Sequence, residues 1–217
     1  PVWRVNESSA QVTKKSLGIT DALKIKGVPF LLIGFFAYCA AEATAMQWAS
    51  TYFVEVKGVA ADRAATFASL FYIGITAGRF ICGFITDKLG DRKLIIIGTA
   101  VVFSGIVALS LPINSYITAV IAFIAIGVGC APIYPCIIHS TPQNFGAENS
   151  GAIIGIQMAS AYVGTTFVPP LFGLIGRAVG FSIMPLYLSV FTALMIIMVE
   201  TTFRIAKKNG EALLSKN

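Results

Sequence analysis

The chain has 217 residues, of which 56% are hydrophobic and only 12% are charged, and its formal net charge is +6. Soluble domains carry about a quarter charged residues, so this chain has too few charges to cover a surface that faces water. Its basic residues do not gather on one face, as they would in a nucleic-acid-binding protein. They lie between apolar runs, which is the pattern of a multi-pass membrane protein.

Residues 1–26 are polar, and several lysines precede the first apolar run. We expect a cytoplasmic linker here, with a short interfacial helix at 18–26. Because the chain starts at Pro1, within a linker, we also expect it to be a fragment or a truncated reading frame.

Six apolar runs follow, at about 28–54, 64–86, 92–111, 116–140, 149–175 and 179–203. A spanning helix needs about 20 apolar residues, and open strands cannot face lipid. The predicted fold class is therefore an all-α integral membrane protein with a bundle of six transmembrane helices at 27–205, followed by a cytoplasmic tail at 206–217. The expected joints are 55–63, 87–91, 112–115, 141–148 and 176–178.

The positions of the basic residues predict the orientation of these helices. If the N-terminus is cytoplasmic, most of the 16 lysines and arginines fall in inside segments. This bias is the positive-inside rule, so we expect both termini in the cytoplasm and the protein in the cell membrane.

The first apolar run holds three candidate substrate residues. Glu42 lies near its middle, where a carboxylate costs about 2.5–3.5 kcal/mol on insertion scales. Glu42 is therefore expected to face a wet cavity as a substrate or proton site, the alternative being a structural partner. Trp48 and Tyr52, four residues apart nearer the outer end, either stack on a sugar ring or belong to the interfacial aromatic belt.

The second apolar run predicts a polar face. At 3.6 residues per turn, Tyr72, Thr76, Arg79 and Gly83 lie on one side of a helix, and this side is too polar for lipid. We expect it to point inward, with Tyr72 near the substrate. Arg79 is expected to join Asp87 in a cytoplasmic gate and not to meet Glu42.

Prolines and small residues mark the fourth and fifth runs. Pro132 and Pro135, and later Pro169 and Pro170, are expected to kink their helices beside a cavity, although prolines are also common in spanning helices. Tyr134, between two prolines, is expected to line that cavity. The pairs Gly74/Gly78 and Gly151/Gly155 predict close helix packing.

Gln157, Ser160, Ala161 and Gly164 form a second small, polar face. Gln157 can bind a sugar hydroxyl or make a helix–helix hydrogen bond. His139, the single histidine, is expected at an interface, with a proton relay as the second interpretation. The four cysteines lie in apolar runs and are interpreted as packing residues. No catalytic motif, nucleotide loop or metal-ligand cluster is apparent, so we expect neither an enzyme nor a bound cofactor.

A charged segment joins the second and third runs. Its pattern is G-x-x-x-D-K-x-G-x-R-K, made by Gly83, Asp87, Lys88, Gly90, Arg92 and Lys93. Gly83 permits a close helix approach, Gly90 permits positive φ, and the basic residues are held at the cytoplasmic face. An ordinary positive-inside loop is the alternative. The segment resembles the signature loop of the major facilitator superfamily of secondary transporters, and we call residues 83–93 the signature loop.

Residues 27–205 resemble the C-terminal six-helix half of such a transporter. Three stretches are similar to fucose permease-like sugar porters, namely 37–53, 127–137 and 151–173. The resemblance implies alternating-access transport of a small polar solute, a sugar, either by uniport or by proton symport. The family has twelve helices with a binding site between two halves, whereas six are present here. We therefore expect a missing N-terminal half or a second copy as partner; the alternatives are an inactive six-helix fragment and a homodimeric pore.

Overall fold

The computed structural model describes residues 18–113 and 115–214, so the predicted linker at 1–17 and the end of the tail lie outside it. Its elements are α1 (Ile19–Lys24), α2 (Val28–Glu55), α3 (Ala61–Leu89), α4 (Asp91–Ser110), α5 (Tyr116–Phe145), α6 (Ala147–Val179), the 3-10 turn η1 (Phe181–Ile183) and α7 (Met184–Leu214). Within the described residues, six helices are long and apolar enough to cross a membrane. The prediction of an all-α membrane protein with six spans is confirmed.

Two joints are much shorter than the hydropathy pattern predicts, and the joint between α6 and α7 lies later in the chain than predicted. Single glycines separate α3 from α4, α5 from α6, and α6 from η1: Gly90, Gly146 and Gly180, with φ of 75°, 86° and 97°. The polar residues expected in loops at 87–89 and 141–145 instead continue the helices. Hydropathy falls where a helix leaves the lipid, but the helix ends only where the backbone turns, and glycine adopts positive φ without a steric penalty. The predicted positive φ of Gly90 is confirmed.

The prolines do not break their helices. Pro132 and Pro135 lie inside a continuous α5, and Pro169 and Pro170 lie inside a continuous α6. Each proline removes one N–H and frees the carbonyl four residues earlier, and close neighbours can accommodate this locally. Both helices are therefore continuous through their prolines, and the predicted kinks beside a cavity stay a prediction.

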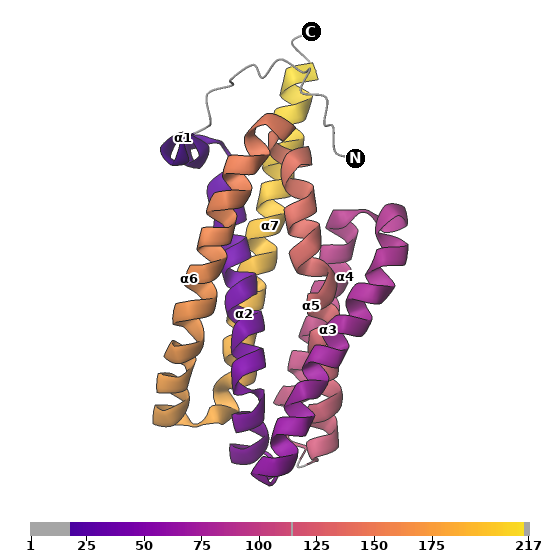
Figure 1. Ribbon diagram of the computed structural model, residues 1–217, viewed down its shortest axis with the longest axis vertical. Coiled ribbons are helices and arrows are strands. Elements are labelled where there is room, and N and C mark those ends of the chain that lie inside the picture. Colours follow the sequence, from indigo (N-terminus) through magenta and orange to yellow (C-terminus); the bar gives the residue numbers. More distant parts are fainter. Residues whose placement is uncertain (1–17, 114, 215–217) are drawn as a thin grey trace, which may run out of the picture.

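The six long helices form two groups of three (Figure 1). In the first group α5 packs along α3 and α4, and in the second α2 packs along α6 and α7. Each group thus takes one helix from one half of the sequence and two from the other half. The two groups meet through α2 with α3, α4 with α7, and α5 with α6.

Glycines hold the first group together at backbone distance. A Cβ atom on Gly127 of α5 would lie 2.3 Å from the carbonyl oxygen of Phe71 in α3, and one on Gly74 would lie 2.5 Å from that of Ile124. The predicted close packing at Gly74 and Gly78 is confirmed. That at Gly151 and Gly155 is wrong for this chain, because no other described atom lies within 4 Å of a Cβ built there.

Candidate functional site

The four residues predicted to share one polar face of the second span do so, but this face is exposed, and its predicted inward direction stays a prediction. Tyr72, Thr76, Arg79 and Gly83 are all exposed along α3, while the opposite side of the helix, including Gly74 and Gly78, is buried against α5. No described residue lies over Gly83 within 4 Å of a Cβ built there. This polar strip of a spanning helix is therefore left open by the part of the chain that the structure describes.

A hollow of about 390 Å³ opens beside this face, between α3 and α5. Proline and alanine in α5 leave room where larger side chains would fill the groove. Tyr134 lies in the wall, as predicted, and its hydroxyl is 3.2 Å from Met158 Sδ of α6. The residues that line the hollow are Arg79, Cys82, Gly83, Thr86, Ala131, Tyr134 and Pro135.

Glu42 lies at the centre of α2 and is partly buried. Its Oε1 is 2.8 Å from the hydroxyl of Tyr38, which is also 3.0 Å from the carbonyl oxygen of Cys130 in α5. The ring of Tyr134 lies 6.3 Å from that of Tyr38, so Glu42 and the hollow belong to one neighbourhood.

Arg79 lines the same hollow as Tyr134, and its guanidinium is near enough to Glu42 for their charges to interact, although no ion pair joins the two in the described structure. Asp87 lies eight residues further along α3, about 12 Å at 1.5 Å per residue, and makes no hydrogen bond or ion pair within the described structure. The two residues do not pair in this conformation, and the gate expected to contain them stays a prediction.

Trp48 and Tyr52 are both built into helix contacts. Trp48 Nε1 donates to the carbonyl of Pro169 at 2.8 Å, and its ring stacks on Phe181. Tyr52 is 2% exposed, and its hydroxyl donates to the carbonyl of Leu109 at 3.2 Å. A buried indole or phenol usually finds such a partner. In this conformation Tyr52 offers no surface to a solute and does not belong to an exposed aromatic belt.

Gln157 makes a helix–helix hydrogen bond, which was the alternative to binding a sugar hydroxyl. Its side chain is fully buried, and Oε1 accepts from the hydroxyl of Thr141 in α5 at 3.2 Å. Nε2 has no hydrogen-bond partner among the described residues. Ser160 and Gly164, on the same face, pack against α2. The small, polar face of α6 therefore points into the bundle and not into the hollow.

One ion pair and one polar contact link the signature loop to other helices. The guanidinium of Arg92 contacts the carboxylate of Glu200 in α7 through Nε and one terminal nitrogen, with Nε 3.1 Å from Oε2. Asp91 is buried, and its Oδ2 lies 2.8 Å from Nδ1 of His139 in α5. The loop thus ties α4 to α5 and α7, whereas Lys88 and Lys93 are exposed.

Sequence reasoning missed three of these residues. Asp91 occupies the unspecified position between Gly90 and Arg92 of the signature pattern. Glu200 is an acidic residue in the last apolar run that the sequence analysis did not single out. Tyr162 is 71% exposed on α6 and interacts with Tyr134. The spacing from Gly151 and Gly155 could have indicated Tyr162. It follows Gly155 by seven residues, about two helical turns, and so lies on the same side of the helix.

Comparison with known proteins agrees with this arrangement. The sequence matches the profile of the Major Facilitator Superfamily over residues 11–216. It is 25% identical over 199 residues to Bypass of stop codon protein 6 of Saccharomyces cerevisiae, covering 87% of this chain and 40% of that protein. It is 24% identical over 155 residues to an uncharacterized MFS-type transporter of Yersinia pestis, covering 70% of this chain and 40% of that protein.

Solved structures share the fold. FucP in its outward conformation superposes with a TM-score of 0.74 at 18% identity, covering 91% of this chain and 47% of FucP. The peptide transporter POT in complex with alafosfalin gives a TM-score of 0.74 at 17% identity, covering 88% of this chain and 44% of POT. The chain spans less than half the length of each of these proteins. On its sequence profile and its six-helix architecture, this multi-pass membrane chain belongs to the Major Facilitator Superfamily.

Proposed function

We propose that this chain forms one half of a secondary transporter that moves a sugar across the cell membrane by alternating access, coupled to protons. It acts as a carrier and not as an enzyme. The observation that carries the proposal is a hollow lined by Arg79 and Tyr134, which Glu42 approaches through its hydrogen bond with Tyr38, a neighbour of Tyr134. A buried carboxyl group, a guanidinium and a phenol supply the acceptors and donors that sugar hydroxyl groups need.

The open face of α3 supports a two-part site. Arg79 and Gly83 are exposed on a spanning helix, and Gly151 and Gly155 leave a second open strip on α6. Charged groups on spanning helices face a protein interior or a wet cavity. A second six-helix unit, either another half or a second copy of this chain, would cover these strips and complete the solute site. With both termini in the cytoplasm, Asp87 would face that unit at the inner end of α3.

Glu42 is the proposed proton site. Burial removes water from a carboxyl group and favours its neutral form, so solute and proton binding can be linked at this position. FucP is described as a fucose:proton symporter, which supports but does not establish the same chemistry here. In this scheme Glu42 takes up one proton from the outer side with the sugar and releases it inside before the empty carrier returns.

The test is a pair of transport measurements on the natural protein that contains these residues, using a panel of radiolabelled sugars. Glu42→Gln keeps the size and hydrogen-bonding capacity of the side chain but cannot titrate. We expect it to retain sugar counterflow and to lose accumulation driven by a proton gradient. Glu55→Gln, at the exposed end of the same helix, is the matched control and should retain both activities.

Other outcomes separate the alternatives. Loss of both activities, or of neither, in Glu42→Gln would refute proton coupling through this residue. If no panel sugar is transported by the wild-type protein, the sugar assignment fails. Sugar-independent leak through liposomes that contain only this chain would instead favour a homodimeric pore.

A further inference from the structure

Tyr38 has two hydrogen-bond acceptors within reach and one proton to give. Its hydroxyl lies 2.8 Å from Glu42 Oε1 and 3.0 Å from the carbonyl oxygen of Cys130. A phenol carries a single proton, and a backbone carbonyl only accepts. The two contacts can both be full hydrogen bonds only if a second proton lies between Tyr38 and Glu42.

The charge state of Glu42 therefore decides where the Tyr38 proton points. When Glu42 is protonated, its own O–H donates to the Tyr38 oxygen, and Tyr38 donates to Cys130. When Glu42 is ionised, it only accepts, and the stronger charge-assisted bond draws the Tyr38 proton toward it. The Cys130 carbonyl then loses the tyrosine as its donor.

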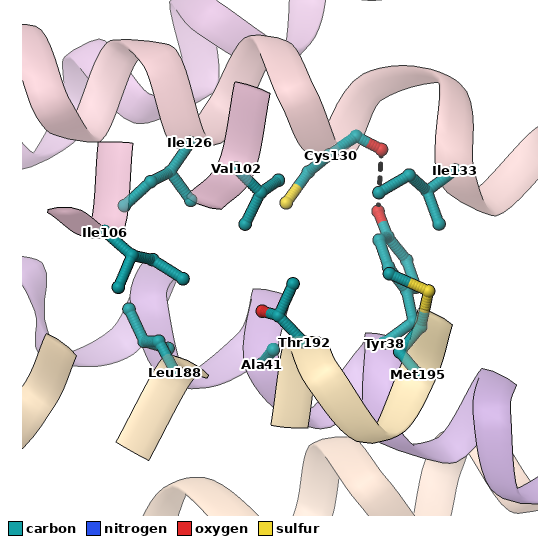
Figure 2. A pocket seen from close by; sticks show the side chains of 10 residues that line it. All are labelled: Tyr38, Ala41, Val102, Ile106, Ile126, Cys130, Ile133, Leu188, Thr192 and Met195. Atoms are coloured by element: carbon teal, nitrogen blue, oxygen red, sulfur yellow. Dashed lines mark hydrogen bonds between the residues drawn. The ribbon is translucent and has the colours of Figure 1, made fainter. Parts of the chain in front are cut away.

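The surroundings limit replacement of that donor by solvent. Tyr38 is 2% exposed and Cys130 is 4% exposed. Figure 2 shows the Tyr38 hydroxyl turned toward the Cys130 carbonyl at the border of a small cavity of about 10 Å³. This volume is at the lower limit for one water molecule, and most of the side chains that line the cavity are apolar.

Other titratable groups face Glu42 but none replaces Tyr38 as its hydrogen-bond partner in the described structure. Cys39 faces it from α2, Arg79 from α3, and Cys130 and Tyr134 from α5. Arg79 acts through its charge, and the thiol groups are weak donors. The exchange of hydrogen bonds is thus confined to one carboxyl, one phenol and one carbonyl.

We propose that Tyr38 transmits the protonation state of Glu42 from α2 to α5. The protonated carboxyl fastens Tyr38 to the Cys130 carbonyl, and the ionised carboxyl releases it. Cys130 lies one helical turn before Tyr134, which lines the hollow, so the exchange acts on the wall of the candidate site. Its use in transport rests on the proposed function, because it requires Glu42 to bind the coupled proton; the hydrogen-bond exchange itself does not.

Infrared spectroscopy of this chain in lipid nanodiscs tests the exchange directly. Replacing Cys39, Cys82 and Cys136 by alanine leaves Cys130 as the single site of a ¹³C=O cysteine label. The protonated Glu42 band is identified by its loss in Glu42→Gln. As pH rises, we expect the labelled carbonyl band to shift to higher wavenumber with the same midpoint as the loss of the Glu42 band.

Two tyrosine variants separate this link from a general effect on packing. Tyr38→Phe should abolish the pH-dependent carbonyl shift. Tyr52→Phe removes a comparable bond from α2 to a carbonyl, that of Leu109, and should leave the shift unchanged. If the alanine changes prevent folding, the wild-type chain labelled at all four cysteines should show the same shift, lost in Tyr38→Phe.

Three results would overturn the proposal: a carbonyl shift that persists in Tyr38→Phe, a Glu42 titration with no carbonyl shift, or no Glu42 titration at any accessible pH. Uptake by the natural protein that ignores a proton gradient, with both infrared bands still moving together, would refute the proposed coupling and leave the Tyr38 link intact.

Discussion

The two helix groups are packed by different means. In the first group the obstacles to a larger residue are mostly backbone atoms, as at Gly127, whose Cβ would lie 2.3 Å from the Phe71 carbonyl oxygen, although Gly78 and Gly105 meet a side-chain atom first. In the second group they are mostly side chains, as at Gly173, whose Cβ would lie 2.3 Å from the Trp48 ring. Gly164 is an exception there, since it faces the carbonyl of Phe36 at 2.8 Å.

This difference indicates how each group can change shape. Backbones in direct contact fix the position of α5 against α3 and α4, because a glycine contact has no rotamer to adjust. Side-chain contacts around α2 can be rearranged by rotation of a ring. Glu42 and Tyr38 lie on α2, in the group packed by side chains, while Cys130 and Tyr134 lie on α5, in the group packed by backbone contacts. The proposed proton site is therefore on the more adaptable helix and contacts the more rigid one.

The largest expected effect comes from a methyl group placed between the backbones of the first group. Gly127→Ala places a Cβ against backbone atoms, so the new clash can be relieved only if a helix moves. We expect the free energy of unfolding to fall by about 3 kcal/mol, the upper part of the range for overpacking. In Gly173→Ala the new Cβ contacts the Trp48 ring, which can rotate away, and the higher helix propensity of alanine stabilises the fold by about 1 kcal/mol. We therefore expect a smaller loss of unfolding free energy than for Gly127→Ala. Unfolding in mixed micelles, monitored by circular dichroism, measures both.

The control for this experiment is Gly155→Ala on the open strip of α6, which should not be destabilising because nothing described lies within 4 Å. Equal losses for Gly127→Ala and Gly173→Ala would contradict the distinction between the two groups.

The next effect concerns the link between the groups at the signature loop. Arg92 of α4 binds Glu200 of α7 with two contacts, and the side chains are 51% and 20% exposed. A double-mutant cycle with Arg92→Gln and Glu200→Gln should give a coupling energy of about 1 kcal/mol, reduced at high salt because the pair is partly solvated. Lys93→Gln is the neighbouring control. A coupling energy indistinguishable from zero would show that the groups are not fastened here.

The smallest effect on stability is expected at Asp87, near the end of α3. Asp87→Asn removes a carboxylate that has no hydrogen bond or ion pair within the described structure, so the unfolding midpoint of this chain should not change. If Asp87 contacts the other half in the closed gate, net transport by the natural protein should fall while sugar binding survives. Unchanged transport at matched expression would limit the signature loop to a topology signal.

The fold was predictable because hydropathy and length restrict the chain strongly. Six long apolar runs in lipid can only be helices, and the positions of α2 to α7 follow from them. The exact joints were not predictable, since residues 141–145 are polar yet helical. Glu42 was found because a carboxyl group in a spanning helix is costly, and Arg79 and Tyr134 were found from the spacing of polar residues and prolines.

The partners of these residues could not be predicted. Tyr52 and Trp48 looked like solute-binding aromatics, but their polar atoms are used by the carbonyls of Leu109 and Pro169. Gln157 lies on the face of α6 that turns inward, and the sequence does not state which of two small, polar faces is covered. Asp91 and Glu200 were missed because each is identified only by its contact with a residue far away in the sequence, His139 and Arg92 respectively.

The sequence by itself determined that this chain is a bundle of spanning helices with a carboxyl group at mid-depth and a signature loop at one end, because the energetic cost of polar groups in lipid acts on each helix separately. The tertiary structure decided that α5 packs with α3 and α4 and that α2 packs with α6 and α7. It also decided which glycines make close helix contacts, and that Arg79, Tyr134 and Cys130 lie around Tyr38 and Glu42. Such contacts depend on the rotation of each helix about its axis, which is set only when its neighbours pack against it.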